Sequence, residues 1–462
     1  MSAPLTVAIL AAGLGTRMKS KKAKVLHRVG GLALAEHVVR RALELTSPDR
    51  VCVVTGHQAD DVETLLSRYG VRFVRQLEQL GTGHALFCSR PALEPSEGLL
   101  LVLYGDTPLL SRATLERLVA AQQDNEYTGG TLITTEPPDP TGYGRILRDT
   151  EGNVRAIVEE RVATEEERKI RQINSGIYCF RSRLLWKHLA EIRPNSTTRE
   201  VFLTDIVEVL ANHGYAVGAL PVADSSELLG INTRVELAAA DTILRRRKAE
   251  QLMLAGVTIE KPETVTIDAE VEVGQDTLIE PFAQLLGATR IGSDCRIGAC
   301  SIVQDSVLAD RVELLPFTMV NTSHLAEDVH VGPYARLRLE NHLAAGARVG
   351  NFVELKKTRV GPGSKALHLA YLGDASIGAA ANIGAGTITC NYDGAAKHAT
   401  SIGDGCFVGS NATLVAPLSL GSGSYVGAGS VITNDVPPKA LGLGRSKQVV
   451  KDGWVEARKK KS

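Results

Sequence analysis

The segment that follows the first apolar run of the chain combines glycines with closely spaced cations. Gly13 and Gly15 leave room for backbone N–H groups to approach an anion, and positive charge comes from Arg17, Lys19, Lys21, Lys22 and Lys24. The segment is not a Walker A loop, because no Gly-Lys-Ser/Thr follows, and Met18 replaces the third glycine of the dinucleotide fingerprint. The pattern predicts a cradle for a polyphosphate.

Asp106 is a second residue that could do chemistry. It follows the apolar run LLLVLY, and residues at the carboxyl ends of neighbouring parallel strands meet at one edge of a sheet. A carboxylate together with substrate phosphates is the usual way in which proteins hold Mg²⁺. Because Thr107 and Pro108 follow, Asp106 could equally cap the next helix, and these residues alone leave both interpretations open.

A third group of reactive side chains lies in the second half of the chain, where a six-residue repeat is interrupted between Val349 and Ile377. The interruption contains Glu354, Lys356, Lys357, Lys365, His368 and Tyr371, and a second one contains Asn391, Tyr392 and Asp393. A single histidine in a loop is usually a solvated surface residue. An imidazole among cations and carboxylates at a break in a repeat instead indicates a functional residue.

The repeat itself predicts the element that must position these residues. Aliphatic side chains recur every six residues, at 291, 297 and 303, at 325, 331, 337, 343 and 349, and at 402, 408, 414, 420 and 426. This spacing does not fit one face of a helix of 3.6 residues per turn, but it fits short strands stacked around a common core. Small and polar residues fill the corners between strands. The second half is therefore predicted to be a β-solenoid.

The first half shows a different pattern. Between about residues 5 and 225, apolar runs such as VAIL, VCVVTG and LLLVLY alternate with amphipathic stretches. Continuous apolar runs between helices indicate strands covered on both faces, hence a mostly parallel α/β sheet. A segment without Pro or Gly from Arg234 to Ala255 predicts a connecting helix that Gly256 ends. The expected domains are residues 1–232, a linker helix 233–256, and residues 257–462.

Composition limits the possible partners and location. The 462 residues have a formal net charge of zero, so nothing global favours nucleic acid or an anionic membrane. No apolar stretch reaches the roughly 20 residues of a membrane span, and the start resembles a strand rather than a signal peptide. Seven scattered cysteines without a C-x-x-C pair indicate reduced thiols. We expect a cytoplasmic protein with a basic tail ending in Arg458, Lys459, Lys460 and Lys461, and no fixed structure there.

A resemblance covers nearly the whole chain. LAAGLGTRM, LHRVGG, QLGTGHA, LYGDTPL, PTGYGRI, INSGIY and GINTR occur in the order and spacing typical of sugar-1-phosphate nucleotidyltransferases. With the hexapeptide half added, the chain resembles the bacterial family of bifunctional N-acetylglucosamine-1-phosphate uridyltransferases and glucosamine-1-phosphate acetyltransferases. The resemblance implies a Rossmann-like nucleotidyltransferase domain followed by a left-handed parallel β-helix. It also implies a homotrimer.

The same resemblance implies roles for matching residues of the first domain. Arg17 and Lys24 are expected to neutralise the triphosphate of UTP, and Asp106 and Asn232 to bind Mg²⁺. The turn from Leu10 and Ala11 to Gly13 is expected to contact uracil and ribose. Further substrate contacts are expected from Gln76, Gly81 and Thr82 (the nucleobase), from Gly144, Glu159 and Asn174 (the sugar), and from Tyr104 and Gly105.

In the β-helix the resemblance makes His368 the general base that takes a proton from the sugar amine, with Glu354 orienting it. Arg338 and Lys356 are expected to hold the sugar phosphate. Further sugar contacts are expected from Tyr371, Asn382 and Asn391, and contacts with acetyl-CoA from Ala385, Tyr392, Ser410, Ala428 and Arg445.

The chain departs from the family pattern at four positions. Leu14 replaces a frequent Lys, and Ala23 replaces the Pro that commonly precedes the loop lysine. Leu339 stands where Pro often follows the clamp arginine, and Leu367 replaces the Gly that usually precedes the base. We expect these changes to affect the paths of the two loops and the reaction rates.

The expected function is synthesis of UDP-N-acetylglucosamine for peptidoglycan and lipopolysaccharide. Glucosamine-1-phosphate would be acetylated with acetyl-CoA, and the resulting N-acetylglucosamine-1-phosphate would react with UTP. In one alternative the solenoid serves only for assembly, but the cations and His368 argue against a mere scaffold. In another the first domain is inactive, which Arg17, Lys24, Asp106 and Asn232 disfavour.

Overall fold

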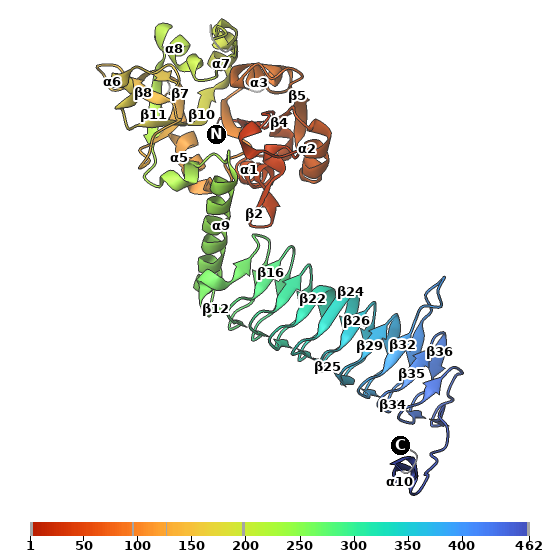
Figure 1. Cartoon of the computed structure of the whole chain (residues 1–462). Coiled ribbons are helices and arrows are strands. Elements are labelled where there is room, and N and C mark those ends of the chain that lie inside the picture. Colours follow the sequence, from red (N-terminus) through yellow and green to blue (C-terminus); the bar gives the residue numbers. More distant parts are fainter. Residues whose placement is uncertain (1–2, 95–96, 126, 196–198, 460–462) are drawn as a thin grey trace. The chain divides into compact units, whose positions relative to one another are not determined.

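The computed structural model describes residues 3–94, 97–125, 127–195 and 199–459. The chain forms two compact units, residues 1–244 and residues 245–462, which are shown in Figure 1 and are described separately below. The division lies inside the long helix α9, Arg234–Leu254.

The first unit contains one large sheet with the strand order β11-β7-β10-β6-β1-β4-β5, extended by the antiparallel pair β8 and β9. Six of the seven strands on the main path point the same way, and only β10 runs antiparallel to its neighbours β6 and β7. The predicted, mostly parallel sheet is confirmed. The strands are β1 (Leu5–Leu10), β4 (Val51–Thr55), β5 (Arg72–Arg75), β6 (Leu99–Tyr104), β7 (Thr128–Thr135), β8 (Arg145–Arg148), β9 (Val154–Val158), β10 (Ile173–Arg181) and β11 (Ala216–Pro221).

Successive residues of the central strands pack into different cores, because side chains alternate between the two faces of a sheet. Val7 and Ile9 belong to one core, whereas Ala8 and Leu10 belong to the other. The helices of this unit are α1 (Leu34–Leu43), α2 (Ala59–Leu66), α3 (Thr82–Cys88), α4 (Arg90–Leu93), α5 (Arg112–Gln123), α6 (Glu165–Arg168), α7 (Ser182–His188) and α8 (Asp205–Asn212). A small ribbon is formed by β2 (Arg28–Val29) and β3 (Leu32–Ala33). The sheet is thus covered on both faces, as its apolar strands predict.

The second unit is a parallel β-helix, confirming the predicted solenoid (Figure 1). One ladder contains β12 (Thr258–Ile259), β15 (Leu278–Ile279), β18 (Arg296–Ile297), β21 (Glu313–Leu314), β23 (His330–Val331), β25 (Arg348–Asn351), β28 (Lys365–His368), β31 (Asn382–Ile383), β34 (Phe407–Val408), β37 (Tyr425–Val426) and β39 (Leu441–Gly442). The other strands belong to two further ladders that share the long strands β22 (Met319–Leu325) and β24 (Arg336–Leu343).

The first of these ladders contains β13 (Thr266–Ile267), β16 (Gln284–Leu286), β19 (Ile302–Gln304), β26 (Glu354–Lys356), β29 (Tyr371–Gly373), β32 (Ile388–Cys390), β35 (Thr413–Val415) and β38 (Val431–Ile432). The second contains β14 (Glu272–Val273), β17 (Arg290–Ile291), β20 (Val307–Leu308), β27 (Arg359–Val360), β30 (Ala375–Ile377), β33 (Thr400–Ile402) and β36 (Leu418–Leu420). Every aliphatic residue predicted to stack inside is buried, and Ile297, Leu314 and Val331 pair in register on successive coils.

The ends of the second unit differ from each other. Helix α9 agrees with the predicted connecting helix, and Gly256 after it has a φ of 98°. Near the C-terminus, Trp454–Lys459 form helix α10, with the Arg458 guanidinium 5.1 Å from the centre of the Trp454 ring. The expectation of no fixed structure is therefore wrong for this part of the tail, because a cation–π contact supports one helical turn. Lys460 and Lys461 lie outside the described residues.

Two general expectations can be compared with the structure. All seven cysteines are free, as their scattered positions predict. Among the described residues, no helix has the length and apolar character needed to cross a membrane.

Candidate active sites

A cavity of about 480 Å³ lies where β1 and β6 end, in the first unit. Its walls come from the loop after β1, from the start of α3 and from residues far apart in the sequence. The predicted site residues that line it are Leu10, Ala11, Gly13, Lys24, Gln76, Gly81, Thr82, Tyr104, Asp106 and Asn232. The position agrees with the general rule that ligands bind at the carboxyl ends of parallel strands.

The predicted phosphate-binding and metal-binding residues meet at this cavity. The ammonium of Lys24 donates hydrogen bonds to a carboxylate oxygen of Asp106 and to Oδ1 of Asn232, the latter at 3.1 Å. Arg17 donates to the same Asn232 oxygen at 2.9 Å. Oxygen atoms of Asp106 and Asn232 thus both accept from the Lys24 ammonium, and hard oxygen donors of this kind suit Mg²⁺. The residues therefore fit the metal that the family resemblance implies.

Two glycines shape the walls of the cavity. Gly15 has a φ of 62°, and a Cβ atom on it would lie 2.6 Å from the Cβ of Lys24. Gly105 donates its N–H to the carbonyl of Leu10 at 2.9 Å, which ties the end of β6 to the end of β1. Gly13, by contrast, has open space where a Cβ would stand, so its backbone N–H can be approached from the cavity.

The residues expected to contact the nucleobase form hydrogen bonds within the protein. Gln76 is buried, and its amide nitrogen contacts the carbonyl of Gly81 at 3.1 Å and Nδ1 of His84 at 3.0 Å. Both amide protons are thus used within the protein, which leaves the amide oxygen for a base. The hydroxyl of Thr82 accepts a hydrogen bond from the N–H of Leu203 at 3.0 Å. Gln76 is therefore placed to accept a hydrogen bond from a base rather than to donate one.

The three expected sugar-binding residues lie together beyond the cavity lining. The N–H of Asn174 donates to the carbonyl of Gly144 at 2.9 Å, and a Cβ on Gly144 would lie 3.7 Å from Oε1 of Glu159. Burial raises the pKa of Glu159, against a 3.3 Å hydrogen bond from the hydroxyl of Thr204. Burial and the charge of Glu159 raise the pKa of the neighbouring Asp205 to about 6.

Sequence reasoning did not identify some residues of the cavity wall. Phe202 and Glu200 line it, although both lie in a segment without a recognisable motif.

Tyr104 is held at the border of the cavity, where burial raises the pKa of its hydroxyl and Thr82 supplies a hydrogen bond. Gly176 has a φ of 81°, and a Cβ atom on it would lie 2.9 Å from the Tyr104 ring, so the glycine leaves the space that this ring uses.

In the second unit, the expected phosphate clamp lies on adjacent coils of one ladder. Arg338 on β24 pairs in register with Lys356 on β26, and Lys356 with Gly373 on β29. The nearby ammonium of Lys397, followed by burial, lowers the pKa of Lys356. Lys397 was not identified from the sequence. The gathering of cationic groups favours a doubly charged anion such as a sugar phosphate.

The sugar-contact residues extend this group. The side-chain amide of Asn391 donates to Oδ2 of Asp374, and Asp374 donates its N–H to the carbonyl of Lys356 at 2.9 Å. A Cβ at Gly373 would lie 2.5 Å from the hydroxyl of Tyr371, so glycine leaves the space that this ring uses. Asn382 lies elsewhere, on β31, next to Lys365 of β28.

The expected partner of His368 is corrected by the structure. Glu354 was expected to orient the imidazole, but its carboxylate accepts a hydrogen bond from Nε of Arg338 at 2.6 Å. Nδ1 of His368 instead contacts Oδ1 of Asn351 at 2.8 Å, and the two residues pair in register on neighbouring coils. His368 is exposed, with Nδ1 held by this contact. The strand ladder decides the partner, since it places residue 351 directly beside residue 368.

Three of the expected acetyl-CoA contacts stack on successive coils. Ala385, Ser410 and Ala428 each follow a glycine, and a Cβ at Gly384 would lie 2.6 Å from the backbone nitrogen of Ser410. Such close approach of coils leaves a smooth edge of backbone and small side chains. Tyr392 is exposed and donates to the carbonyl of Gly394 at 2.6 Å, and the exposed Arg445 follows β39.

The four departures from the family pattern have different structural consequences. Leu14 lines the cavity, and Ala23 is buried and donates its N–H to Gln58. Leu339 has a φ of 60°, which a proline ring cannot adopt, so this strand takes a path that is closed to proline. Leu367 is exposed, and its carbonyl lies where a Cβ on Gly350 would stand.

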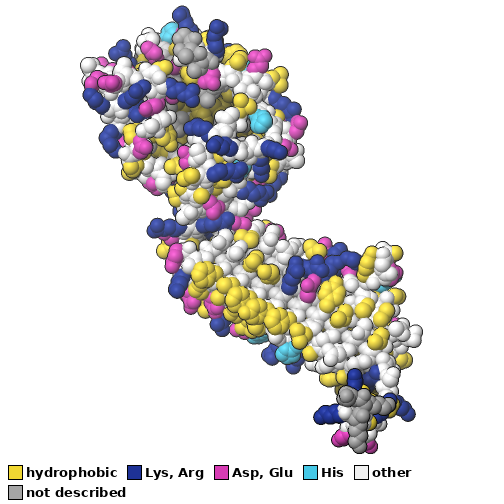
Figure 2. Space-filling view, viewed as in Figure 1, with side chains coloured by type: hydrophobic (Ala, Val, Ile, Leu, Met, Phe, Trp, Pro, Cys, Tyr) yellow, Lys and Arg dark blue, Asp and Glu magenta, His cyan; other side chains and the backbone are white. Residues whose placement is uncertain are grey.

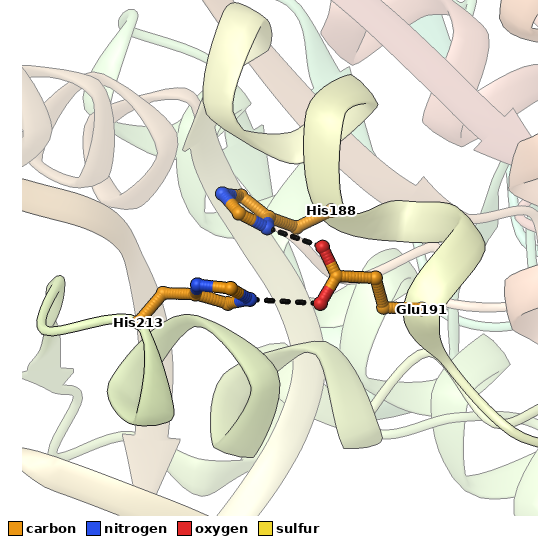
Figure 3. A group of neighbouring side chains, drawn as sticks. All are labelled: His188, Glu191 and His213. Atoms are coloured by element: carbon orange, nitrogen blue, oxygen red, sulfur yellow. Dashed lines mark hydrogen bonds and ion pairs between the residues drawn. The ribbon is translucent and has the colours of Figure 1, made fainter.

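A further group of titratable residues in the first unit is shown in Figure 3. His188 and His213 each bond to a different oxygen of Glu191, at 2.7 and 2.8 Å. These distances are those of hydrogen bonds. The ligand atoms of a tetrahedral zinc ion would lie farther apart, at roughly 3.3 Å. The group connects the end of α7 with the end of α8.

Each half of the chain matches a family of known proteins. Residues 7–197 match the MobA-like NTP transferase domain, residues 270–304 the bacterial transferase hexapeptide (six repeats), and residues 399–434 the hexapeptide repeat of succinyl-transferase. These matches confirm the predicted fold class, a nucleotidyltransferase domain followed by a left-handed β-helix of hexapeptide repeats.

Three relatives named bifunctional protein GlmU are similar over almost their entire length. The chain is 55% identical over 460 residues to the protein of Solibacter usitatus, covering 100% of this chain and 98% of the relative. It is 50% identical over 463 residues to that of Koribacter versatilis, covering 98% of each chain. For the protein of Anaeromyxobacter sp. strain Fw109-5 the identity is 50% over 460 residues, covering 99% of this chain and 93% of the relative.

Proposed function

This chain belongs to the family of the bifunctional protein GlmU and makes UDP-N-acetylglucosamine by acetyl transfer and nucleotidyl transfer, and on that premise we propose which residues carry each step. The observation that supports the first assignment most directly is the meeting of Lys24, Asp106 and Asn232 at the end of the parallel strands. The assignments below rest on the geometry of each unit taken separately.

In the uridylyl transfer, a phosphate oxygen of N-acetylglucosamine-1-phosphate attacks the α-phosphorus of UTP, and pyrophosphate leaves. Lys24 and Arg17 bind and neutralise the triphosphate, while the backbone of Leu10 to Gly13 and the amide of Gln76 hold the nucleoside. Glu159, Asn174 and Gly144 bind the sugar. Asp106 and Asn232 would hold Mg²⁺, which would supply further neutralisation of phosphate charge. The protein contributes position and charge rather than a covalent nucleophile.

In the acetyl transfer, His368 accepts a proton from the amine of glucosamine-1-phosphate as the nitrogen attacks the thioester carbon of acetyl-CoA. CoA then leaves as its thiol. Asn351 holds Nδ1 of the imidazole, which leaves Nε2 for the substrate. Arg338 and Lys356 bind the sugar phosphate, with Tyr371, Asn382 and Asn391 around the sugar. The edge formed by Ala385, Ser410 and Ala428, with Tyr392 and Arg445 nearby in sequence, receives acetyl-CoA.

The active assembly is a homotrimer. Aromatic and aliphatic side chains stand exposed on successive coils of the β-helix, with Phe317 stacked on Tyr334 at 4.9 Å and Tyr334 on Phe352 at 5.4 Å. We call this row, Phe282, Phe317, Tyr334, Phe352 and Leu369, the aromatic ladder. Figure 2 shows hydrophobic side chains gathered along the β-helix. An exposed apolar row of this length supports contact between copies of the chain.

The enzyme would act in the cytoplasm, where UTP and acetyl-CoA are available, and its product would serve peptidoglycan and lipopolysaccharide synthesis. The test is an incubation of purified protein with glucosamine-1-phosphate, acetyl-CoA, UTP and Mg²⁺, analysed by mass spectrometry. UDP-N-acetylglucosamine should form only when acetyl-CoA is present. If supplied N-acetylglucosamine-1-phosphate reacts with UTP but no acetylated sugar forms, the β-helix is an assembly module and the acetyl-transfer assignment is wrong.

A further inference from the structure

Gln58 holds the loop between Lys19 and Lys24 through both ends of its side-chain amide. Its Nε2 donates to the carbonyl of Lys21 at 2.8 Å, and its Oε1 accepts the N–H of Ala23. One side chain thus bonds to two backbone groups of a loop that lies 35 residues away in sequence. Ala23 is only 1% exposed, so its N–H is satisfied inside the protein by this contact.

The backbone of Gln58 is itself unusual. The residue precedes helix α2 with φ 53° and ψ 43°, a left-handed conformation that residues other than glycine rarely adopt. Its side chain makes no capping hydrogen bond to α2, so helix capping does not account for the conformation. Strained conformations of this kind persist where the surrounding structure needs the side chain in a particular place.

The loop that Gln58 holds carries Lys24 directly after Ala23. The ammonium of Lys24 must reach the oxygen of Asn232 and the carboxylate of Asp106, and a small displacement of its backbone would separate them. Lys19, Lys21 and Lys22 are exposed, and Lys19 also has a positive φ of 47°. The hydrogen bonds from Gln58 are therefore well placed to fix the position of Lys24.

We propose that Gln58 is a positioning residue for uridylyl transfer, which fixes the path of residues 21–23 and thereby the ammonium of Lys24. The proposal rests on the role assigned above to Lys24. The proposal adds the side-chain amide that holds Lys24 in position. This amide belongs to the segment after β4 and not to the loop itself.

The first test replaces Gln58 with methionine, which has a similar length but cannot form either hydrogen bond. In the full-length protein, Gln58→Met should lower kcat for uridylyl transfer about tenfold, with a smaller change in KM for N-acetylglucosamine-1-phosphate. Acetyl transfer by the same protein should stay within twofold. Thr64→Ala, at an exposed position on the helix α2 that follows Gln58, is the matched control and should leave both activities within twofold.

A second substitution tests rescue. Ala23 has a φ of −54°, which a proline ring can adopt, so Ala23→Pro should stiffen the loop without needing the hydrogen bond to Gln58. In the Gln58→Met background, Ala23→Pro should restore kcat to within about threefold of Ala23→Pro alone. A merely structural role of Gln58, remote from the loop, would show no such rescue.

A third readout does not depend on activity or on the proline variant folding. Lys19, Lys21 and Lys22 are exposed, so freeing the loop should make trypsin cut there at least fivefold faster in Gln58→Met, with other cleavage sites unchanged. Unchanged cleavage at Lys21 and Lys22, or an equal loss of uridylyl and acetyl transfer, would overturn the proposal. A wild-type protein without uridylyl transfer would refute the proposed function instead, and the cleavage rates would still show whether Gln58 holds the loop.

Discussion

The ammonium nitrogen of Lys24 lies 3.1 Å from the amide oxygen of Asn232, although 208 residues separate the two in the sequence. In the same place Lys24 is paired with Asp106, and both partner side chains are the proposed ligands of Mg²⁺. A divalent ion and an ammonium cannot occupy one position between these oxygens. Substrate phosphates, which attract the ammonium, would therefore help to free both ligands for the metal.

This competition predicts opposite effects on metal binding and on catalysis. Lys24→Met removes the cation that contacts both proposed ligands and leaves Arg17 on Asn232 alone, so the affinity of the free enzyme for Mn²⁺, used as a paramagnetic probe, should rise several-fold. Uridylyl transfer should nevertheless fall by about 10² or more, because the triphosphate loses a neutralising charge. Electron paramagnetic resonance titration measures the first effect, and Asp106→Asn should weaken binding as the control. Weaker Mn²⁺ binding in Lys24→Met would contradict the competition.

Substitutions can distinguish the role of His368 from that of Asn351. His368→Ala should lower acetyl transfer by about 10²- to 10⁴-fold and leave uridylyl transfer unchanged. Asn351→Ala should cost less, about tenfold, because it removes the amide oxygen that contacts Nδ1 and orients the imidazole. Initial rates of both reactions from pH 6 to 9 provide the measurement. A change in uridylyl transfer in a folded, assembled variant would argue against two independent sites.

A half-buried carboxyl group makes stability depend on pH. Burial, followed by the charges of Glu159 and Glu208, raises the pKa of Asp205 from 3.8 to about 6. The folded state therefore binds this proton more readily, and the free energy of unfolding should increase as the pH falls from about 6 toward 4. Asp205→Asn should increase the free energy of unfolding at pH 7.5 by about 1 kcal/mol. This figure is smaller than the raised pKa alone would give, because solvent screens the half-exposed group. Thermal unfolding at pH 5 and 7.5 should show this advantage shrinking at the lower pH.

Two glycines of the cavity wall should respond differently to an added methyl group. Gly81 has a φ of 104°, and its Cβ would lie 2.4 Å from the carbonyl oxygen of Val201. Gly81→Ala should therefore reduce the free energy of unfolding by about 1–3 kcal/mol. Gly13→Ala meets no atom within 4 Å and is the matched control for stability. Equal thermal stability of the two variants would contradict the role given to the backbone at Gly81.

The aromatic ladder should control assembly. Tyr334 stacks between Phe317 and Phe352 and is 49% exposed in the single chain, so Tyr334→Glu should place a charge in the contact between copies. Sedimentation should then show a monomer in place of a trimer, with uridylyl transfer retained. Glu340→Gln, at an exposed position outside the ladder, should leave the assembly unchanged. A Tyr334→Glu trimer as stable as the wild type would exclude the ladder from the interface.

Some parts of the site could be read from sequence, and others could not. The cradle from Gly13 to Lys24 was predicted because glycines and cations follow a recognisable strand, whereas the metal role of Asp106 was implied by the family resemblance. The family resemblance made Glu354 the partner of His368, whereas in the structure Glu354 bonds to Arg338 and the imidazole contacts Asn351, which no motif marks. The ladder pairs residue 351 with residue 368, so one full coil of the β-helix decides the contact.

The sequence by itself determined the two architectures and most of the residues that line the cavity. Hydrophobic periods of this kind are local properties, since the spacing of side chains along a strand fixes which face is buried. Only the tertiary structure brought Asn232 to Lys24, turned Glu354 toward Arg338, and placed the amide of Gln58 on the loop after Lys19. Such contacts depend on the order and register of strands far apart in the chain, which the local spacing of side chains does not specify.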